Sequence, residues 1–357
     1  MSDTDQKTDR SRESSRESAP RSAWEKALMG VLLLGLAVLI PLAVRDYIKQ
    51  YKKSKLPKIE CFRQSAEEGY ADAQYYLGLC YNLGVDVPQD VEKAVGLYRQ
   101  SAENGFAEAM CALGVCYQRG TVVEKDDAQA VEWYRKAAKK GFVPAMYNLA
   151  ECYVHDEGVP RDETEAFRLY KKAARKGFPA AQCALANCYT NGEGVPRDYE
   201  RAAKWYRKAA QKGHAYAQCL LGLLYADGLG VERDAAESIR WLQASADQGI
   251  PEAQYHLGIC YAEGHGVAQD FTKAAELYRL SAEQGYAEAQ WSLGVCYENG
   301  TGVERDEDEA EVWFVKAADQ GHAAARWTIG RDAEEESPSD ENEAAPPAAE
   351  GESGANP

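Results

Sequence analysis

Histidine is scarce in this chain, and the common sequence signatures of hydrolases are missing. Only five histidines occur in 357 residues, too few and too scattered for a histidine-rich metal or catalytic centre. The chain contains no Ser-x-x-Lys, Lys-Thr-Gly, Gly-x-Ser-x-Gly or His-Glu-x-x-His motif. We therefore expect no enzyme activity, no catalytic residue, no cofactor and no metal site.

An excess of basic residues is also missing. The formal net charge is −16, whereas nucleic-acid binders usually present a basic surface, so we expect no nucleic-acid partner. Hydrophobic residues make up 45% of the chain and charged residues 27%, which is typical of a packed protein.

One long apolar run stands near the N-terminus. Residues 27–44 (ALMGVLLLGLAVLIPLAV) contain no charge over eighteen residues, which is near the lower limit for a membrane-spanning helix. A cleaved signal peptide fits less well, because the charged leader is long and no small-x-small site follows. We expect an uncleaved transmembrane helix, preceded by a disordered charged N-terminus at 1–26.

The charges that flank this run favour a cytoplasmic location for the rest of the chain. Six basic residues follow the run within fifteen residues and four precede it, so the positive-inside tendency is weak. A periplasmic or other extracytoplasmic location is the alternative. Residues 45–70 are predicted to be a basic linker and a leading helix. The last segment, 331–357, carries one basic and nine acidic residues and is predicted to be a disordered acidic tail.

Between these segments the chain is one repeat. The sequence Leu-Gly-x-Cys-Tyr at 77–81 recurs in similar form every 36 residues, giving seven units over 71–322 without an insertion. Residues 323–330 begin an eighth unit that is not completed. Each unit shows apolar residues at helical spacing twice, separated by a loop that ends in Asp. That Asp is the expected N-cap of the second helix.

In four units a Gln or Glu follows the Asp three residues later, which predicts a capping box. These residues are Gln129, Glu165, Glu237 and Glu309. A single helix pair cannot bury its own apolar stripe, so we expect an all-α fold in which seven helix pairs stack into an α/α superhelical solenoid.

The pattern A-x-A-x-x-x-L-G-x-x-Y-x-x-G-x-G-V-x-x-D, followed by A-x-x-W/L-Y-x-x-A-A-x-x-G, resembles the Sel1-like repeat family, relatives of the tetratricopeptide repeat. The resemblance covers about 70% of the chain. It implies a right-handed superhelix that acts as an adaptor in protein complexes. Two loops depart from the pattern, because Asp86 and Val122 replace the second loop glycine, and we expect these loops to deviate.

The ten cysteines are interpreted as free thiols. Six share one repeat position that Leu224 occupies in the remaining unit, which is typical of a small apolar core site. Cys111, Cys183 and Cys219 share a second position. Equivalent residues in stacked helices should lie about 8–10 Å apart, too far for a disulfide.

Positive charge is concentrated in the second to fourth units. Residues 107–214 carry 18 Lys/Arg against 14 Asp/Glu, whereas residues 215–322 carry 6 against 19. A solvated outer face is the simpler interpretation of the basic second helices. Contact with anionic lipid headgroups is the functional alternative.

A partner is expected to dock on the concave face built from the first helices. Two residues before the repeat Leu stand the aromatic residues Tyr75, Tyr147, Tyr255, Trp291 and Trp327. The residues four positions further on vary from unit to unit in size and polarity. Together with Glu263 and Glu298, the aromatic residues suit a peptide with basic and apolar side chains. Simple packing between neighbouring first helices is the alternative role.

These features predict a membrane-anchored scaffold or adaptor that binds a partner protein or peptide in the groove of the repeats. Two alternatives remain from other classes. One is an envelope hydrolase of the cysteine-rich Sel1-like type, some members of which carry a β-lactamase label. The other is a periplasmic regulator of cell-wall enzymes.

Overall fold

The computed structural model describes residues 58–335, and every regular element in that range is an α-helix. This confirms the predicted all-helical repeat fold. The predicted transmembrane segment 27–44 lies outside the described residues, as does the charged N-terminus 1–26. Within 58–335, none of the helices combines the length and the apolar character needed to cross a membrane.

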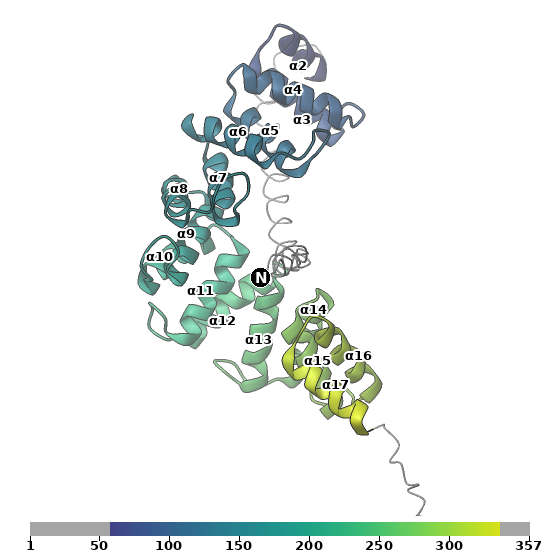
Figure 1. The fold of residues 1–357 in the computed structure, drawn as a ribbon. Coiled ribbons are helices and arrows are strands. Elements are labelled where there is room, and N and C mark those ends of the chain that lie inside the picture. The colour runs from purple at the N-terminus through teal and green to yellow at the C-terminus, as the bar shows by residue number, and fades with distance from the viewer. Residues whose placement is uncertain (1–57, 336–357) are drawn as a thin grey trace, which may run out of the picture. The chain divides into compact units, whose positions relative to one another are not determined.

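The chain divides into two compact units at Arg233. Unit one, described over residues 58–233, stacks its helices in chain order (Figure 1). Its first helices are α3 (Ala71–Leu83), α5 (Ala107–Arg119), α7 (Val143–His155), α9 (Pro179–Asn191) and α11 (Ala215–Asp227). Its second helices are α2 (Lys58–Glu67), α4 (Val91–Glu103), α6 (Asp127–Lys139), α8 (Glu163–Arg175) and α10 (Tyr199–Ala210). The leading helix α2 therefore stands at a second-helix position of the repeat.

Unit two, described over residues 234–335, continues the same alternation. Its second helices are α12 (Ala235–Ala246), α14 (Phe271–Glu283) and α16 (Glu307–Asp319). Its first helices are α13 (Pro251–Glu263), α15 (Ala287–Asn299) and α17 (Ala323–Glu335). Helix α17 runs on to Glu335, past the predicted end of the partial repeat at residue 330 and into the segment assigned to the acidic tail.

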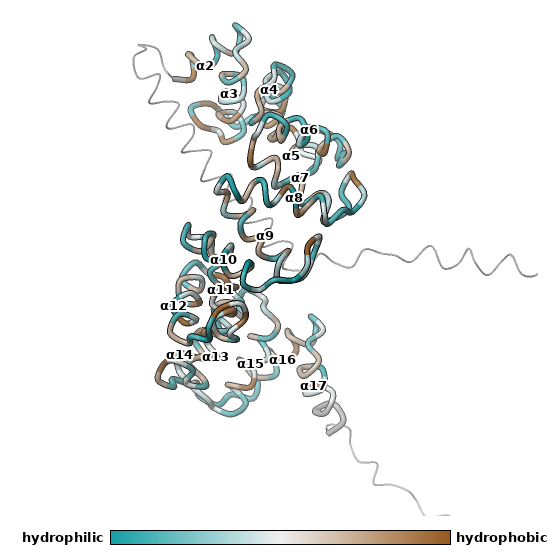
Figure 2. The backbone as a smooth tube through the Cα atoms, turned by 90° about the vertical axis from the view of Figure 1, so that its left-hand side faces the viewer, coloured by the Kyte–Doolittle hydropathy of each residue, from teal (hydrophilic) through white to brown (hydrophobic). Residues whose placement is uncertain are grey.

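A close crossing between an aromatic ring and a glycine holds four of the seven helix pairs together, at Gly78, Gly114, Gly258 and Gly294. A Cβ atom added to Gly78 would lie 2.8 Å from Cε1 of Tyr98 on the second helix, and one added to Gly294 would lie 2.6 Å from Cε1 of Phe314. Real Cβ atoms do not approach this closely, so the Leu-Gly pair of the repeat marks the point where the two helices touch. Figure 2 shows hydrophobic and hydrophilic residues mixed along each helix, as expected for helices with one buried side.

The Asp before each second helix is its N-cap, as predicted. In all seven repeats its side chain accepts a hydrogen bond from a backbone N–H of the first turn; these residues are Asp90, Asp126, Asp162, Asp198, Asp234, Asp270 and Asp306.

One half of the predicted capping box is wrong, because the side chain three residues after the Asp does not accept the backbone N–H of that Asp. The backbone N–H of Asp126 already donates to the carbonyl oxygen of Tyr117 at 3.0 Å, so it has no proton left for Gln129. The Gln129 side chain donates to the Asp126 carboxylate instead, at 3.0 Å. Asp162 and Asp306 are held in the same way, by the carbonyls of Tyr153 and Tyr297. The loop connection therefore replaces the capping box.

Polar contacts join each repeat to the next. A buried Gln of the first helix donates to a carbonyl near the end of the preceding second helix, at 3.1–3.5 Å, in Gln74, Gln182, Gln218, Gln254 and Gln290. An Arg of the second helix donates to the Tyr hydroxyl of the following first helix, at 2.8–3.3 Å, in the pairs Arg99–Tyr117, Arg135–Tyr153, Arg207–Tyr225 and Arg279–Tyr297.

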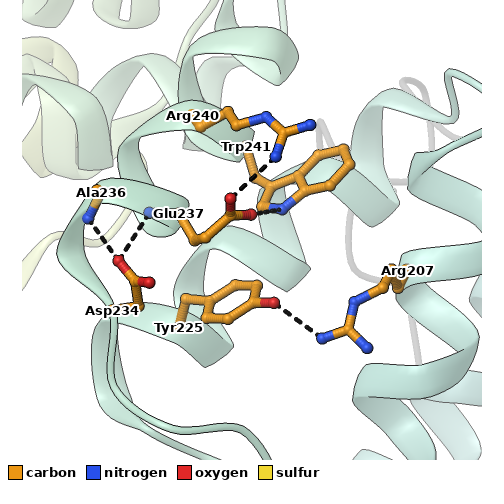
Figure 3. A network of polar contacts seen from close by, with 7 residues as sticks. All are labelled: Arg207, Tyr225, Asp234, Ala236, Glu237, Arg240 and Trp241. Atoms are coloured by element: carbon orange, nitrogen blue, oxygen red, sulfur yellow. Dashed lines mark hydrogen bonds and ion pairs between the residues drawn. The ribbon is translucent and has the colours of Figure 1, made fainter.

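Figure 3 shows the Arg207–Tyr225 contact of unit one, with an N–O distance of 2.8 Å. It also shows the start of α12 in unit two, where Asp234 caps the helix through two backbone N–H groups. One turn on, Glu237 accepts from Arg240 and from the indole N–H of Trp241, both at 2.9 Å. Each repeat is thus tied by directional bonds as well as by apolar packing.

The two loops that lack the second glycine do not deviate. Asp86 and Val122 have φ of 61° and 66°, close to the 66° of Gly194 at the equivalent position. The expected deviation is therefore wrong. The ends of the Val122 loop are fixed, because Thr121 N donates to the Cys116 carbonyl and the Asp126 N–H is held by Tyr117. Closure of the loop imposes a left-handed conformation that a β-branched residue adopts only with strain.

Replacing Val122 with Gly is therefore expected to raise the free energy of unfolding by about 1 kcal/mol, since the strain is removed. Urea unfolding followed by circular dichroism measures the change. The reverse substitution, Gly194→Val, is the matched control and should destabilise by more than about 2 kcal/mol. Its Cβ would lie 2.2 Å from the Glu163 carbonyl oxygen. A destabilising Val122→Gly would contradict the assignment of strain.

Candidate partner-binding face

The aromatic position predicted to line the groove packs at the junction between repeats. Tyr147 is only 6% exposed, and its ring lies 5.7 Å from those of Tyr170 and Phe178. Tyr170 belongs to the second helix of the same repeat, and Phe178 directly precedes the next first helix. Cys111, Cys183 and Cys219 share the position and are buried as well. Packing between neighbouring repeats therefore determines which side chains occupy this position.

Tyr75 and Tyr255 repeat this arrangement with part of the ring exposed. Tyr255 lies 5.8 Å from Tyr278 and 5.3 Å from Tyr286, between ring centroids. Tyr75 has the same pair of neighbours in Tyr98 and Phe106. Burial raises the pKa of the Tyr75 hydroxyl above its usual value, with smaller contributions from nearby acidic groups. Both tyrosines pack mainly at the junction between repeats, and only part of each ring meets solvent.

The two tryptophans differ from each other. Trp291 stacks on His322 at 5.5 Å and packs against Ala317, Ala318 and Ala325. Trp327, on α17, the last of the described helices, is 68% exposed. Of the five predicted aromatic residues, Trp327 alone is largely exposed.

A neighbouring line of residues is partly exposed in every repeat. One residue after the aromatic position stand Tyr76, Ala112, Asn148, Ala184, Leu220, His256, Ser292 and Thr328, all half-buried. Three residues later stand Val115, Glu151, Asn187, Leu223, Ile259 and Val295, also half-buried, with Leu79 buried in the first repeat. We call these two lines together the first-helix face. The first line was missed from the sequence, although its variation between repeats was visible there.

The two predicted acidic residues have different surroundings. Glu263 is exposed and pairs with His265 in the following loop, with 2.9 Å between Oε2 and Nδ1. Glu298 is half-buried at the position where Gln118 and Thr190 contact the hydroxyl of a second-helix Tyr. It therefore belongs to the side of α15 that meets α16.

Two other carboxylates begin the first helices of unit two. Glu252 and Glu288 stand at the second residue of α13 and α15, four residues before His256 and Ser292 of the first-helix face. Burial raises the pKa of the Glu252 carboxyl, and the charge of Glu288 raises it further. The charge of Glu288 therefore disfavours the ionised form of Glu252.

The cysteine side chains are thiols, and all but Cys61 and Cys260 are buried. Burial raises the pKa of Cys80, Cys116 and Cys296 to about 11, and that of Cys111, Cys152 and Cys188 to about 12. Thiols of this kind stay protonated near neutral pH and are poor nucleophiles. They act as small core residues.

Histidines also have structural roles. His214 and His322 each accept the first-turn backbone N–H of the next helix through Nδ1, at 3.2 Å. Burial lowers the pKa of His214 to about 4, so the ring stays neutral and keeps its acceptor. Among residues 58–335, no three His, Cys, Asp or Glu side chains come together as metal ligands.

The exposed fraction of the side chain at the aromatic position distinguishes a residue that packs between repeats from one that is open to a partner. Tyr147→Ala is expected to lower the free energy of unfolding by about 3 kcal/mol, because it leaves a cavity at the repeat junction. Trp327→Ala should change it by less than about 1 kcal/mol, because the ring is mostly in solvent. Thermal and urea unfolding of both full-length variants check this. Equal losses would mean that exposure does not distinguish the two sites.

Comparison with known proteins agrees with this geometry. The family model for the Sel1 repeat matches residues 71–106, 107–142, 143–178, 179–214, 215–250, 251–286 and 287–322. No curated protein matches the chain.

Two solved structures share the fold at substantial sequence identity. One is a protective antigen present in uropathogenic Escherichia coli strains and displaying an SLR fold, 38% identical with a TM-score of 0.68. That match covers 77% of this chain and 59% of the antigen's chain, so the present chain spans about three fifths of the antigen's length. The other is a Sel1 repeat protein from Oxalobacter formigenes, 33% identical with a TM-score of 0.62 over 87% of this chain and 90% of that one.

The seven matched segments, the helix pairs and these two structures agree on one architecture. Solenoids of this kind generally serve protein–protein interaction and are generally non-catalytic scaffolds. The chain belongs to the Sel1 repeat family.

Proposed function

We propose that this chain is a membrane-anchored scaffold that holds a partner polypeptide on the first-helix face. The observation that carries the proposal is the contrast between two sets of positions in the same helices. The buried positions of Ala73 and Leu77 keep one residue type through all seven repeats, whereas the packing position of Tyr147 holds Tyr, Trp or Cys. The half-exposed first-helix face varies more widely, and its first line alone includes Tyr, Ala, Asn, Leu and His. Packing does not require that variation, whereas recognition of an irregular partner does.

The apolar members of the face favour contact with side chains of a partner. Tyr76, Leu220, Leu223, Ile259 and Val295 each keep part of their surface in water. Side chains of this kind, next to fully buried neighbours, are the usual anchors of a protein interface. A polypeptide laid across the first helices of either unit would cover the members of the face in that unit.

The acids at the start of α13 and α15 favour a partner with basic as well as apolar side chains. Burial raises the pKa of Glu252, and the charge of Glu288 raises it further. A Lys or Arg from the partner would offset that repulsion and would lower the pKa of Glu252 again. Charge complementarity of this kind contributes mainly to specificity and to the association rate.

The membrane part of the proposal rests on the apolar run 27–44, and the cytoplasmic orientation on the basic residues after it. Thiols suit a reducing compartment. Protease added outside intact cells is expected to leave a C-terminal tag on the full-length protein intact. Prompt loss of the tag would place the repeats on the other side.

A peptide selection tests the binding face. The purified full-length chain in lipid nanodiscs is used to select from random fifteen-residue peptides, and binding of the enriched peptides is measured by fluorescence anisotropy. We expect enrichment of Lys or Arg together with apolar residues. The double substitution Glu252→Lys, Glu288→Lys should weaken binding at least tenfold, which corresponds to about 1.4 kcal/mol.

The control has the same charge change on the second helices of unit two. Glu276→Lys with Glu311→Lys alters two exposed acids of α14 and α16 and should leave binding within about twofold. Equal loss in both double variants would indicate a non-specific charge effect. Enriched peptides that bind both variants as they bind the parent chain would refute the proposed face.

A further inference from the structure

Six exposed lysines form two rows on the second helices of unit one. Lys136, Lys172 and Lys208 occupy one repeat position of α6, α8 and α10, and Lys140, Lys176 and Lys212 follow four residues later, just after the ends of these helices. Residues four apart lie on the same side of a helix, and neighbouring packed helices lie about 8–10 Å apart. We call this set the lysine ladder.

Acidic residues are few in the sequence around the ladder, where Glu132 stands one turn before Lys136. The stretches 133–150, 166–192 and 201–226 carry fourteen Lys and Arg and no Asp or Glu. Acids of these repeats cluster instead in the loops and in the first turns of the second helices, such as Glu163, Glu165 and Glu200. Charge in unit one is therefore separated along the second helices.

The helix dipole explains only part of this separation. Cations are favoured at the C-terminal end of any helix, so every repeat should show them. Yet four of the seven second helices have an acid at one position of the last turn, namely Glu103, Asp247, Glu283 and Asp319. The other three have Lys139, Arg175 and Gln211 there. The basic surface is particular to the second, third and fourth repeats.

The ladder lysines contact rings and a carbonyl rather than carboxylates. Lys136 Nζ lies 4.0 Å from the centroid of the Trp133 ring, and Lys208 Nζ lies 4.0 Å from that of Trp205. Lys212 Nζ donates to the Gly177 carbonyl. None of the ion pairs seen within residues 58–335 includes a ladder lysine. Their charge is available to an anionic partner.

Few apolar side chains around the ladder are open to a partner, because lysines lie over the half-buried rings of Trp133, Phe167 and Trp205. The large hydrophobic side chains that are exposed in unit one are Tyr70, Leu83, Val85, Val122 and Leu229, all outside 123–228. A protein interface normally needs such anchors at its centre. A surface of lysines without them matches anionic headgroups, which attract delocalised basic charge.

We propose that the lysine ladder docks on anionic phospholipid headgroups, so that unit one lies against the membrane surface while the first-helix face stays open to a partner. The proposal is independent of what binds that face. The apolar run 27–44, thirteen residues before α2, is where the sequence expects the membrane to be.

Lysine footprinting tests this on the full-length chain. The protein is mixed with vesicles of phosphatidylcholine alone or with 30% phosphatidylserine, acetylated with a limiting reagent, and analysed by mass spectrometry. We expect the ladder lysines to react at least threefold more slowly on the phosphatidylserine vesicles. Lys93 on α4 and Lys273 and Lys316 in unit two are internal controls, and their rates should not change. Raising salt to 1 M should remove the protection, since the Debye length falls from about 10 Å at 0.1 M to about 3 Å.

A variant adds a second readout. Lys172→Glu with Lys176→Glu changes two exposed side chains, and circular dichroism confirms the fold. In this variant the other four ladder lysines should react at equal rates on both vesicle types.

Three results would overturn the proposal. One is equal acetylation of the ladder in the parent chain on both vesicles. Another is protection by soluble polyglutamate but not by phosphatidylserine, which would assign the surface to an acidic protein. The third is protection on every vesicle that disappears when residues 336–357 are deleted, which would assign it to the acidic tail of this chain.

Discussion

The contact between a second-helix ring and a first-helix glycine is the constraint on which the rest of the structure depends. At Gly78 and Tyr98 it brings the two helices so close that no side chain fits between them. The same contact recurs at Gly114, Gly258 and Gly294, so these helix pairs have nearly the same crossing. Where Ala150 and Ala186 replace the glycine, the tyrosine hydroxyls of Tyr170 and Tyr206 find partners in Glu151 and Asn187.

Once the crossing is set, the remaining contacts between repeats follow from it. The carbonyls at the end of one second helix come within reach of the buried Gln of the next first helix. The Arg of the same second helix reaches the next Tyr hydroxyl. These bonds are directional, so they set the register of the stack, while the apolar contacts supply the driving force. A solenoid built in this way leaves the outer sides of its helices free to vary.

The exposed residues of the first helices and those of the second helices differ from repeat to repeat in different ways. On the first helices the half-exposed residues change in size, which suits contact with an irregular polypeptide. On the second helices of the second to fourth repeats, the exposed residues of the later turns are mostly basic. In unit two the same second-helix positions hold Ala244, Leu280 and Lys316, so the basic surface is not a property of the fold. Each side of the solenoid can therefore have a separate partner.

The sequence by itself determined the repeat length, the helix pairs and the Asp N-caps, because periodic apolar residues and cap residues act over short distances along the chain. It also pointed to the buried thiols. Tertiary structure decided the rest. Which of two adjacent first-helix residues is buried, as Tyr147 is, and which meets solvent, as Asn148 does, depends on the packing of the next repeat, since adjacent residues on a helix differ by about 100°. The capping-box prediction was wrong because of a tertiary contact as well. The Asp126 N–H donates to a carbonyl of the preceding helix, and no local sequence pattern indicates that bond. Loop closure likewise held Val122 in a backbone conformation that its own side chain disfavours.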